Sequence, residues 1–139
     1  MSMTSDLRTR LLSVAAIAAA VEGRIARFER PRGLNNAPEF PAVRLTLQSP
    51  GRGYSHEGPV GLDRARVQID VWAESAAAAE PLFVLIRNEM ETPASVNAGA
   101  TRFHTAQLTS GGDTEPEDLA DQKRVYRIRA DFEFYHEGL

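Results

Sequence analysis

The sequence predicts a single α+β domain, residues 1–139, in which a mainly antiparallel four-stranded sheet carries two helices packed on one face. Three observations predict it. At 139 residues the chain suits one domain with its own hydrophobic core. Four stretches read as strands, with apolar and polar residues alternating most clearly in the second. Two further stretches space their apolar residues by three and four, so the order is helix, two strands, helix, two strands.

The first helix is predicted over residues 5–20. Ser5 is placed to cap its N-terminus, and Gly23 follows as a stop signal. Residues 24–28 are predicted to form a short extended piece before Pro31 begins a loop. The apolar positions at helical spacing are Leu7, Leu11, Leu12, Val14, Ala15 and Ala18.

The first two strands are predicted at residues 42–48 and 64–73. In each, branched or long apolar residues alternate with polar ones, as in a strand with one covered face. The connection between them, residues 49–63, is rich in glycine and proline and is expected to be a long, mobile loop. Connections of this length are usually functional or disordered.

The second helix is predicted to follow Ser75, its N-cap, and to run to about Glu91. Its apolar stripe consists of Leu82, Phe83, Ile86 and Met90. Pro81 interrupts the pattern, because a proline beyond the first turn clashes with a preceding carbonyl group. The helix therefore either bends at Pro81 or begins near Glu80.

The last two strands are predicted at residues 101–109 and 122–135, paired as a hairpin across an acidic, glycine-containing loop at residues 110–121. The apolar face of the final strand consists of Tyr126, Ile128, Ala130, Phe132 and Phe134. The opposite sheet face is expected to be polar, and the alternation leaves open whether water or a neighbouring molecule covers it.

The residue types argue against an enzyme. The chain has no cysteine, which excludes disulfides and thiolate chemistry. His56, His104 and His136 lack metal-ligand spacing, and no serine stands in a nucleophile elbow. The acidic residues at 113–121 lack the glycine and terminal glutamate of a calcium loop. The prediction is therefore no catalytic residue, no cofactor and no metal.

Charge and hydropathy predict a folded protein without a membrane anchor. The most apolar stretch, residues 11–21, is about half of what a bilayer requires, and its flanks do not suit a signal peptide, so we expect intracellular synthesis. Residues 24–66 carry a net charge of +4 and residues 67–139 one of −7. This asymmetry either guides one subunit onto the next or is charge scattered over a solvated surface.

One segment carries a family resemblance. Residues 66–73, Arg-Val-Gln-Ile-Asp-Val-Trp-Ala, precede an alanine-rich helix that ends in Leu85-Ile86-Arg87, and the chain closes with Arg-Ile-Arg-Ala-Asp-Phe at 127–132. With the Gly-Arg-Ile turn at 23–25 and the strand at 41–47, this order resembles the phage tail-completion, or tail-terminator, family of long-tailed phages and gene transfer agents.

The resemblance implies a structural virion protein. It implies a homo-oligomeric ring, generally of six subunits, that caps the tail tube and joins it to the head–tail connector. DNA would pass through the lumen without specific binding, and assembly would take place in the bacterial cytoplasm. A neck or head-closure protein of similar fold, a small ligand-binding α+β domain, and an enzyme that uses the acidic loop or a histidine stay open as alternatives.

The residues expected to meet other subunits fall into two groups. The loop 49–63 offers a set of exposed contacts, and the polar sheet face offers a second set. Trp72 lies on the polar side of its strand, where it either anchors an interface or is tucked under the helix or loop that follows. The candidates are Arg52, Tyr54 and His56 in the loop, and Arg66, Gln68, Asp70, Trp72, Arg127 and Arg129 on the sheet face.

Overall fold

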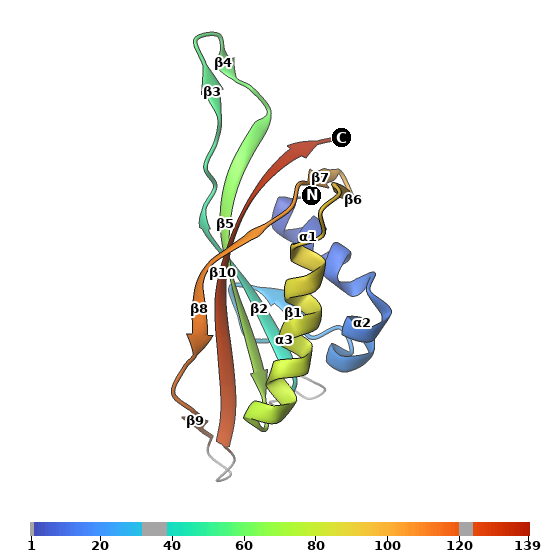
Figure 1. Cartoon of the computed structure of the whole chain (residues 1–139), viewed down its shortest axis with the longest axis vertical. Coiled ribbons are helices and arrows are strands. Elements are labelled where there is room, and N and C mark those ends of the chain that lie inside the picture. The colour runs from blue at the N-terminus through green and yellow to red at the C-terminus, as the bar shows by residue number, and fades with distance from the viewer. Residues whose placement is uncertain (1, 32–38, 120–123) are drawn as a thin grey trace.

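The computed structural model describes residues 2–31, 39–119 and 124–139. Within these ranges the chain forms one mixed sheet of eight strands, a separate two-stranded ribbon and three helices (Figure 1). The predicted four-stranded, mainly antiparallel sheet with two helices is therefore wrong. The additional strands span only two or three residues each, too few to show a period of two, and one of them pairs in parallel.

The centre of the sheet consists of long strands that are antiparallel neighbours. These are β2 (Ala42–Ser49), β5 (Leu62–Ala73), β10 (Arg124–Gly138) and β8 (Gln107–Asp113). At one edge, β1 (Ile25–Arg27) pairs in parallel with β2, at the position predicted to be a short extended piece. Since β1 and β2 run in the same direction, the sheet is mixed.

The predicted strand at 101–109 is two strands that pair with β10 at different places. β7 (Thr101–Phe103) pairs with the end of β10, whereas β8 pairs with its middle, and residues 104–106 separate them. Two shorter strands, β6 (Val96–Ala98) and β9 (Glu117–Asp118), pair with β7 and β10. The predicted loop at 110–121 is thus mostly extended chain as far as residue 118, and residues 120–121 lie outside the described residues.

The predicted helix at 5–20 is broken into α1 (Met3–Leu12) and α2 (Ala15–Val21). Ser2, and not Ser5, caps α1, with its Oγ accepting from the Ser5 backbone N–H at 3.1 Å. The break follows Ser13, because Val14 has extended dihedral angles. Apolar spacing continues across the break, so the sequence pattern alone does not reveal it.

Helix α3 (Ala76–Met90) confirms the predicted cap, since the Ser75 Oγ accepts from the Ala78 N–H at 3.1 Å. Pro81 lies inside the helix. The alternative in which the helix begins near Glu80 is therefore wrong.

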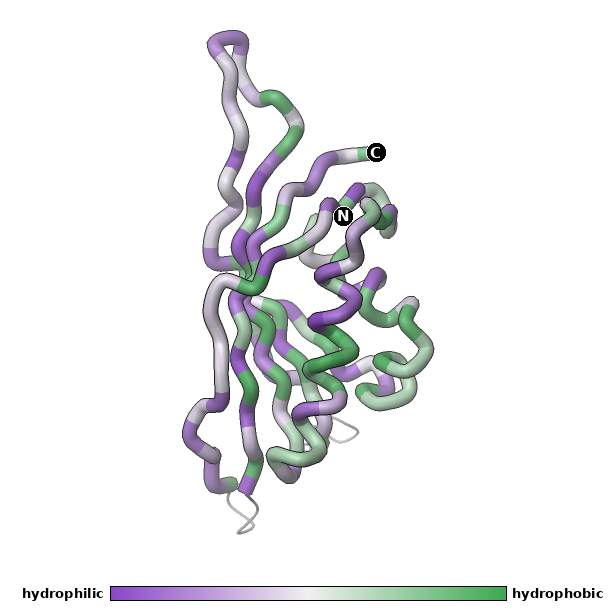
Figure 2. The backbone as a smooth tube through the Cα atoms, viewed as in Figure 1, coloured by the Kyte–Doolittle hydropathy of each residue, from purple (hydrophilic) through white to green (hydrophobic). Residues whose placement is uncertain are grey.

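All three described helices cover the same side of the sheet (Figure 1). Hydrophobic residues concentrate in α3 and in the strands behind it (Figure 2). Full burial of one such side chain stabilises the fold by roughly 1.5–3 kcal/mol. Side chains with no exposed surface include Leu7, Leu11, Ile17 and Val21 from α1 and α2, Ile86 and Met90 from α3, and Leu45, Ile69 and Phe132 from the sheet. Among the described residues, no helix is both long and apolar enough to cross a membrane.

The connection predicted at 49–63 forms a projecting hairpin, which we call the arm and define as residues 50–61. Its tip carries the ribbon of β3 (Tyr54–Ser55) and β4 (Gly58–Pro59), beyond the end of the sheet (Figure 1). At its base the Arg64 N–H donates to the Gly51 carbonyl at 2.9 Å. Gly51 has a φ of +52°, and a Cβ there would overlap the Arg64 carbonyl oxygen, so only glycine suits this position.

Candidate functional site

The polar face of the sheet is organised around Asp70, whose side chain is fully buried. Arg44 on the neighbouring strand lies directly opposite in the pairing register and donates from Nε and Nη2 to Asp70 Oδ2, at 3.1 and 2.9 Å. Gln68 Nε2 lies 3.1 Å from both carboxylate oxygens. The Nε of Arg127 lies 3.7 Å from Oδ1. One buried carboxylate thus holds together side chains from three adjacent strands.

Trp72 lies next to this network and is only 4% exposed. Three arginine side chains cover its ring, with guanidinium carbons 5.0 Å (Arg44), 5.5 Å (Arg30) and 5.8 Å (Arg127) from the centroid. Stacked guanidinium groups are attracted by the ring quadrupole. On the polar side of the sheet, the chain's own arginines therefore bury Trp72. A hollow of about 510 Å³ remains beside it, lined in part by Phe28 and Glu29.

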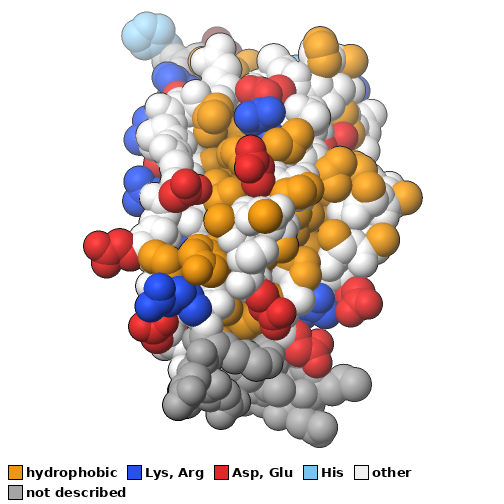
Figure 3. Space-filling model, turned by 60° about the horizontal axis from the view of Figure 1, so that its bottom comes forward, with side chains coloured by type: hydrophobic (Ala, Val, Ile, Leu, Met, Phe, Trp, Pro, Cys, Tyr) orange, Lys and Arg blue, Asp and Glu red, His pale blue; other side chains and the backbone are white. Residues whose placement is uncertain are grey.

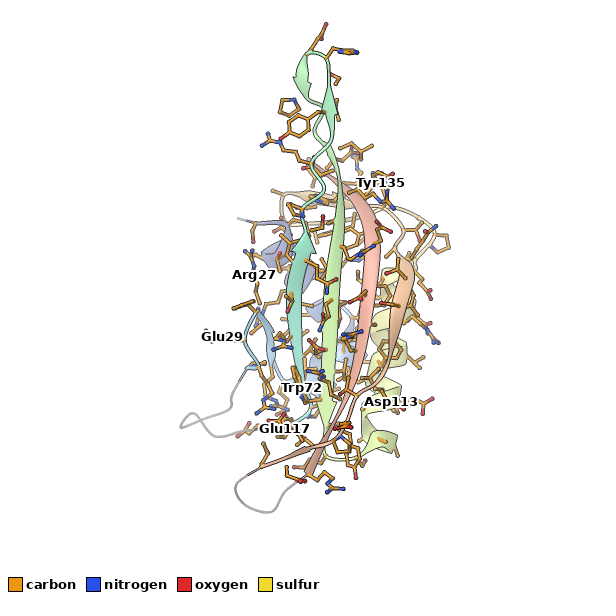
Figure 4. The ribbon with its side chains drawn as sticks, turned by 90° about the vertical axis from the view of Figure 1, so that its left-hand side faces the viewer. Arg27, Glu29, Trp72, Asp113, Glu117 and Tyr135 are labelled. Carbon is orange, nitrogen blue, oxygen red and sulfur yellow. The ribbon has the colours of Figure 1, made fainter. Side chains whose placement is uncertain are left out.

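The predicted contact residues of the arm stand apart from this cluster. Tyr54 is 68% exposed, and His56 is also exposed. The guanidinium carbon of Arg52 lies 5.9 Å from the Tyr54 ring centroid. Figure 4 shows the arm beyond one end of the sheet and Trp72 toward the other end. The predicted site residues therefore form two separate groups.

Arg66 and Arg129 lie on the polar face between these groups, and both are exposed. In the pairing register, Arg66 lies opposite Glu133 and Arg129 opposite Asp70. Neither forms an ion pair with another described residue, in contrast to Arg44 and Arg127. They are accordingly available for contact with a neighbouring molecule.

Sequence reasoning missed Arg30 and Arg44. The alternation around Val43 places Arg44 on the polar face. Its contact with Asp70, 26 positions further along the chain, depends on the register of β2 against β5. Arg30 follows β1 and reaches both Trp72 and Glu117 of β9, with an Nη1 to Oε2 distance of 2.9 Å in the ion pair. No signal in the sequence indicates that contact.

Two histidines have carboxylate side chains nearby. Burial lowers the pKa of His136 from its ordinary value, and the charge of Asp63 opposes that shift. His104 Nε2 lies 3.6 Å from a carboxylate oxygen of Glu137. Among the described residues, no three metal-binding side chains come together. The site on the polar face itself consists of packed arginine, carboxylate and aromatic groups.

A protein family and two solved structures are similar to this chain. The family model of tail completion protein gp17 matches residues 5–137. A chain in the solved structure titled "Virion of native gene transfer agent (GTA) particle" has 16% identity and a TM-score of 0.68, with 99% of this chain and 96% of that chain covered. A second solved chain has 14% identity and a TM-score of 0.51, with 96% of both chains covered. No curated protein has a significant sequence match to the chain.

The two solved structures, both of low identity, show a shared fold. The family match extends over nearly the whole sequence, including the Asp70 and Trp72 strand and the closing strand β10. The chain therefore belongs to the tail completion protein gp17 family.

Proposed function

We propose that this protein is a structural tail terminator, whose subunits form a ring of six that caps the tail tube and joins it to the head–tail connector. Membership of the tail-completion family supports a structural role in a phage-type tail. The observation that carries the finer proposal is the arm, because it projects from the domain and exposes large apolar side chains (Figure 1).

The arm exposes apolar side chains to water when the protein is isolated. Tyr54 and Val60 are 68% and 53% exposed, and Leu62 at its base is 39% exposed. A two-stranded ribbon is marginally stable in water without a surface to pack against. An arm of this kind gains its packing from another molecule, and we assign Arg52, Tyr54 and His56 to contact with the tube or the connector.

The sheet supplies the rigid body that such a contact requires. Asp70 ties three strands together, and β5 continues from the sheet into the base of the arm. Arg66 and Arg129 extend the interface over the polar face. The net charge of −3 suits a lumen through which DNA passes without tight binding, since tight binding depends on clustered basic residues that neutralise phosphates.

The test uses particles produced without this gene and imaged by negative staining. The proposal predicts tails of uncontrolled length, detached from heads. Tails of normal length that are attached to heads would overturn it. Detached tails of normal length would indicate the neck or head-closure role instead.

Complementation then tests the arm. A Tyr54→Ser, Val60→Ser double variant should fold normally and fail to restore particles. The matched control is Leu139→Ser, which removes an apolar side chain that is 63% exposed, outside both the arm and the polar face. Equal restoration by both variants would remove the arm from the proposal.

A further inference from the structure

The strand β8 forms an open edge of the sheet. All of its seven residues are exposed, and within the described ranges it pairs only with β10. Soluble proteins usually protect such an edge with lysine, proline or a covering element, because its free backbone groups can pair with another chain. Residues 107–113 contain neither lysine nor proline. One register shift, between Leu108 and Ser110, interrupts this edge, and no described strand covers its outer side.

An apolar groove of about 780 Å³ lies between β8 and α3. Phe83 and Val84 of α3 line one side, and Leu108 of β8, which is 41% exposed, lines the other. The space-filling view shows hydrophobic side chains gathered on the helix side of the molecule (Figure 3). Two exposed acids, Glu80 and Asp113, also line the groove, and neither forms an ion pair with a described residue. Arg87 lines it as well, with its Nε 3.9 Å from Glu91 Oε1.

The opposite edge of the sheet carries an aromatic side chain in an unfavourable backbone conformation. Phe28 directly follows β1, is 74% exposed and has a φ of +67°. A bulky residue in the left-handed region costs on the order of 1–3 kcal/mol, a strain that typically marks functional positions. The Phe28 N–H donates to the Leu45 carbonyl at 2.8 Å, which holds the backbone in place. On either side of it, Arg27 and Glu29 are exposed, and neither forms an ion pair with another described residue.

These two surfaces suit each other. The strand order places β1 and β8 on opposite sides of β2, β5 and β10, as Figure 4 shows for Arg27 and Asp113. One surface combines an exposed phenylalanine with an arginine and a glutamate, and the other combines an apolar groove with two acids and an arginine, so each charge of the edge finds an opposite charge in the groove. Contacts between different surfaces on opposite sides of a subunit repeat around a closed ring, whereas a surface that pairs with itself stops at a dimer.

We propose that the Phe28 edge of one copy of this chain docks into the α3–β8 groove of the next copy. This inference rests on the proposed ring and assigns the surfaces through which its subunits meet. The arm is the competing occupant of the groove. It extends along the strands and not sideways from the sheet, whereas the Phe28 edge lies on the side of the sheet opposite the groove.

The first experiment uses the absence of native cysteine. Particles are produced with the Arg27→Cys, Asp113→Cys double variant, treated with a short bismaleimide and run on a denaturing gel. The inference predicts covalent dimers and higher multimers, while each single variant stays monomeric. Two results would overturn the inference. One is multimers from a Tyr54→Cys, Asp113→Cys variant but none from the Arg27→Cys, Asp113→Cys variant. The other is monomers alone from Arg27→Cys, Asp113→Cys particles that contain the protein.

The second experiment uses the strain at Phe28. Phe28→Gly removes both the aromatic contact and the conformational cost, because glycine readily adopts a positive φ. The isolated variant should therefore have a higher Tm than the parent, while particle titre falls at least tenfold. An unchanged titre would overturn the inference.

Charge exchange separates this inference from the proposed function. Arg27→Glu and Asp113→Arg should each lower particle titre, and their combination should restore it, because the ion pair reforms with its signs exchanged. If the gene is required for tail completion but the combination does not restore titre, the docking inference fails and the proposed function stands. If particles are normal without the gene, the proposed function itself fails.

Discussion

Asp70→Ala removes the carboxylate at the centre of the polar face. It deletes two charge-assisted hydrogen bonds from Arg44 and the contact with Gln68. A hydrogen bond to a charged group contributes about 1.5–3 kcal/mol net. Arg44 and Arg127 are 27% and 31% exposed and regain water once they are released, which offsets part of the loss. We therefore expect the free energy of unfolding to fall by about 2–3 kcal/mol.

The assay is urea unfolding followed by fluorescence and circular dichroism. Trp72 is the single tryptophan of the chain, so fluorescence reports directly on the ring that the arginines cover. A loss of this size corresponds to a fall in Tm of roughly 5–10 °C for a chain of this length. The native emission of Asp70→Ala should also shift to the red, because the released arginines expose the ring to water.

The control is Glu133→Ala, which breaks the ion pair with Arg64 on the same sheet face. Arg64 is 56% exposed, so water screens this pair and the expected loss is much smaller than that for Asp70→Ala. A double-mutant cycle of Asp70→Ala with Arg44→Ala should give a coupling of at least about 1 kcal/mol. A loss for Asp70→Ala within about 0.5 kcal/mol of zero, or an equally small coupling, would refute the view that this carboxylate joins the strands.

Three further outcomes are expected. Arg10→Ala should lower the free energy of unfolding in urea by about 3 kcal/mol, because it breaks a buried ion pair with Glu89 and a hydrogen bond to the Glu89 carbonyl. Arg87→Ala breaks only the exposed Arg87–Glu91 pair and should lower it by under about 0.5 kcal/mol. Pro81→Ala should raise the free energy of unfolding by about 1–3 kcal/mol, since it restores a helical hydrogen-bond donor, and no rise in Tm would contradict this reasoning. Burial lowers the folded-state pKa of His136 below its ordinary value of about 6.5. Between these two pKa values the unfolded chain binds more protons than the folded chain, so the free energy of unfolding should fall as the pH drops through about 6.5. His136→Phe should reduce this dependence in thermal scans between about pH 5 and 7, and an unchanged slope would assign it to other groups.

Local patterns were sufficient for several elements. Alternation located the central strands around Leu45, Ile69 and Phe132, because their buried side is decided residue by residue along one strand. Ser75 and the stripe through Ile86 located α3, since a cap and a helical repeat are short-range signals. The segment at 66–73 led to the family.

The candidate site was predicted in part. Asp70, Trp72 and Arg127 were assigned to the polar face, where the structure brings them together. The covering roles of Arg30 and Arg44 were not predicted, because they depend on strand register and on the path of the chain after β1. Likewise, the alternation gave no sign that α1 would bury Asp6 and Arg10 against residues more than 75 positions away.

The sequence by itself thus determined which residues of the central strands and of α3 face the core, where those elements lie, and which family the chain belongs to. The apolar stripe predicted for the first helix was wrong in part, because Ala15 is exposed whereas Ile17 and Val21 are buried. Only the tertiary structure decided the parallel pairing of β1, the break between α1 and α2, the projection of the arm and the placement of Phe28 and the α3–β8 groove on opposite edges. The physical reason is the distance along the sequence over which each signal acts. Periodicity and caps act within a few residues, whereas pairing, edges and buried ion pairs are set by partners distant in sequence, whose approach depends on the folded sheet as a whole.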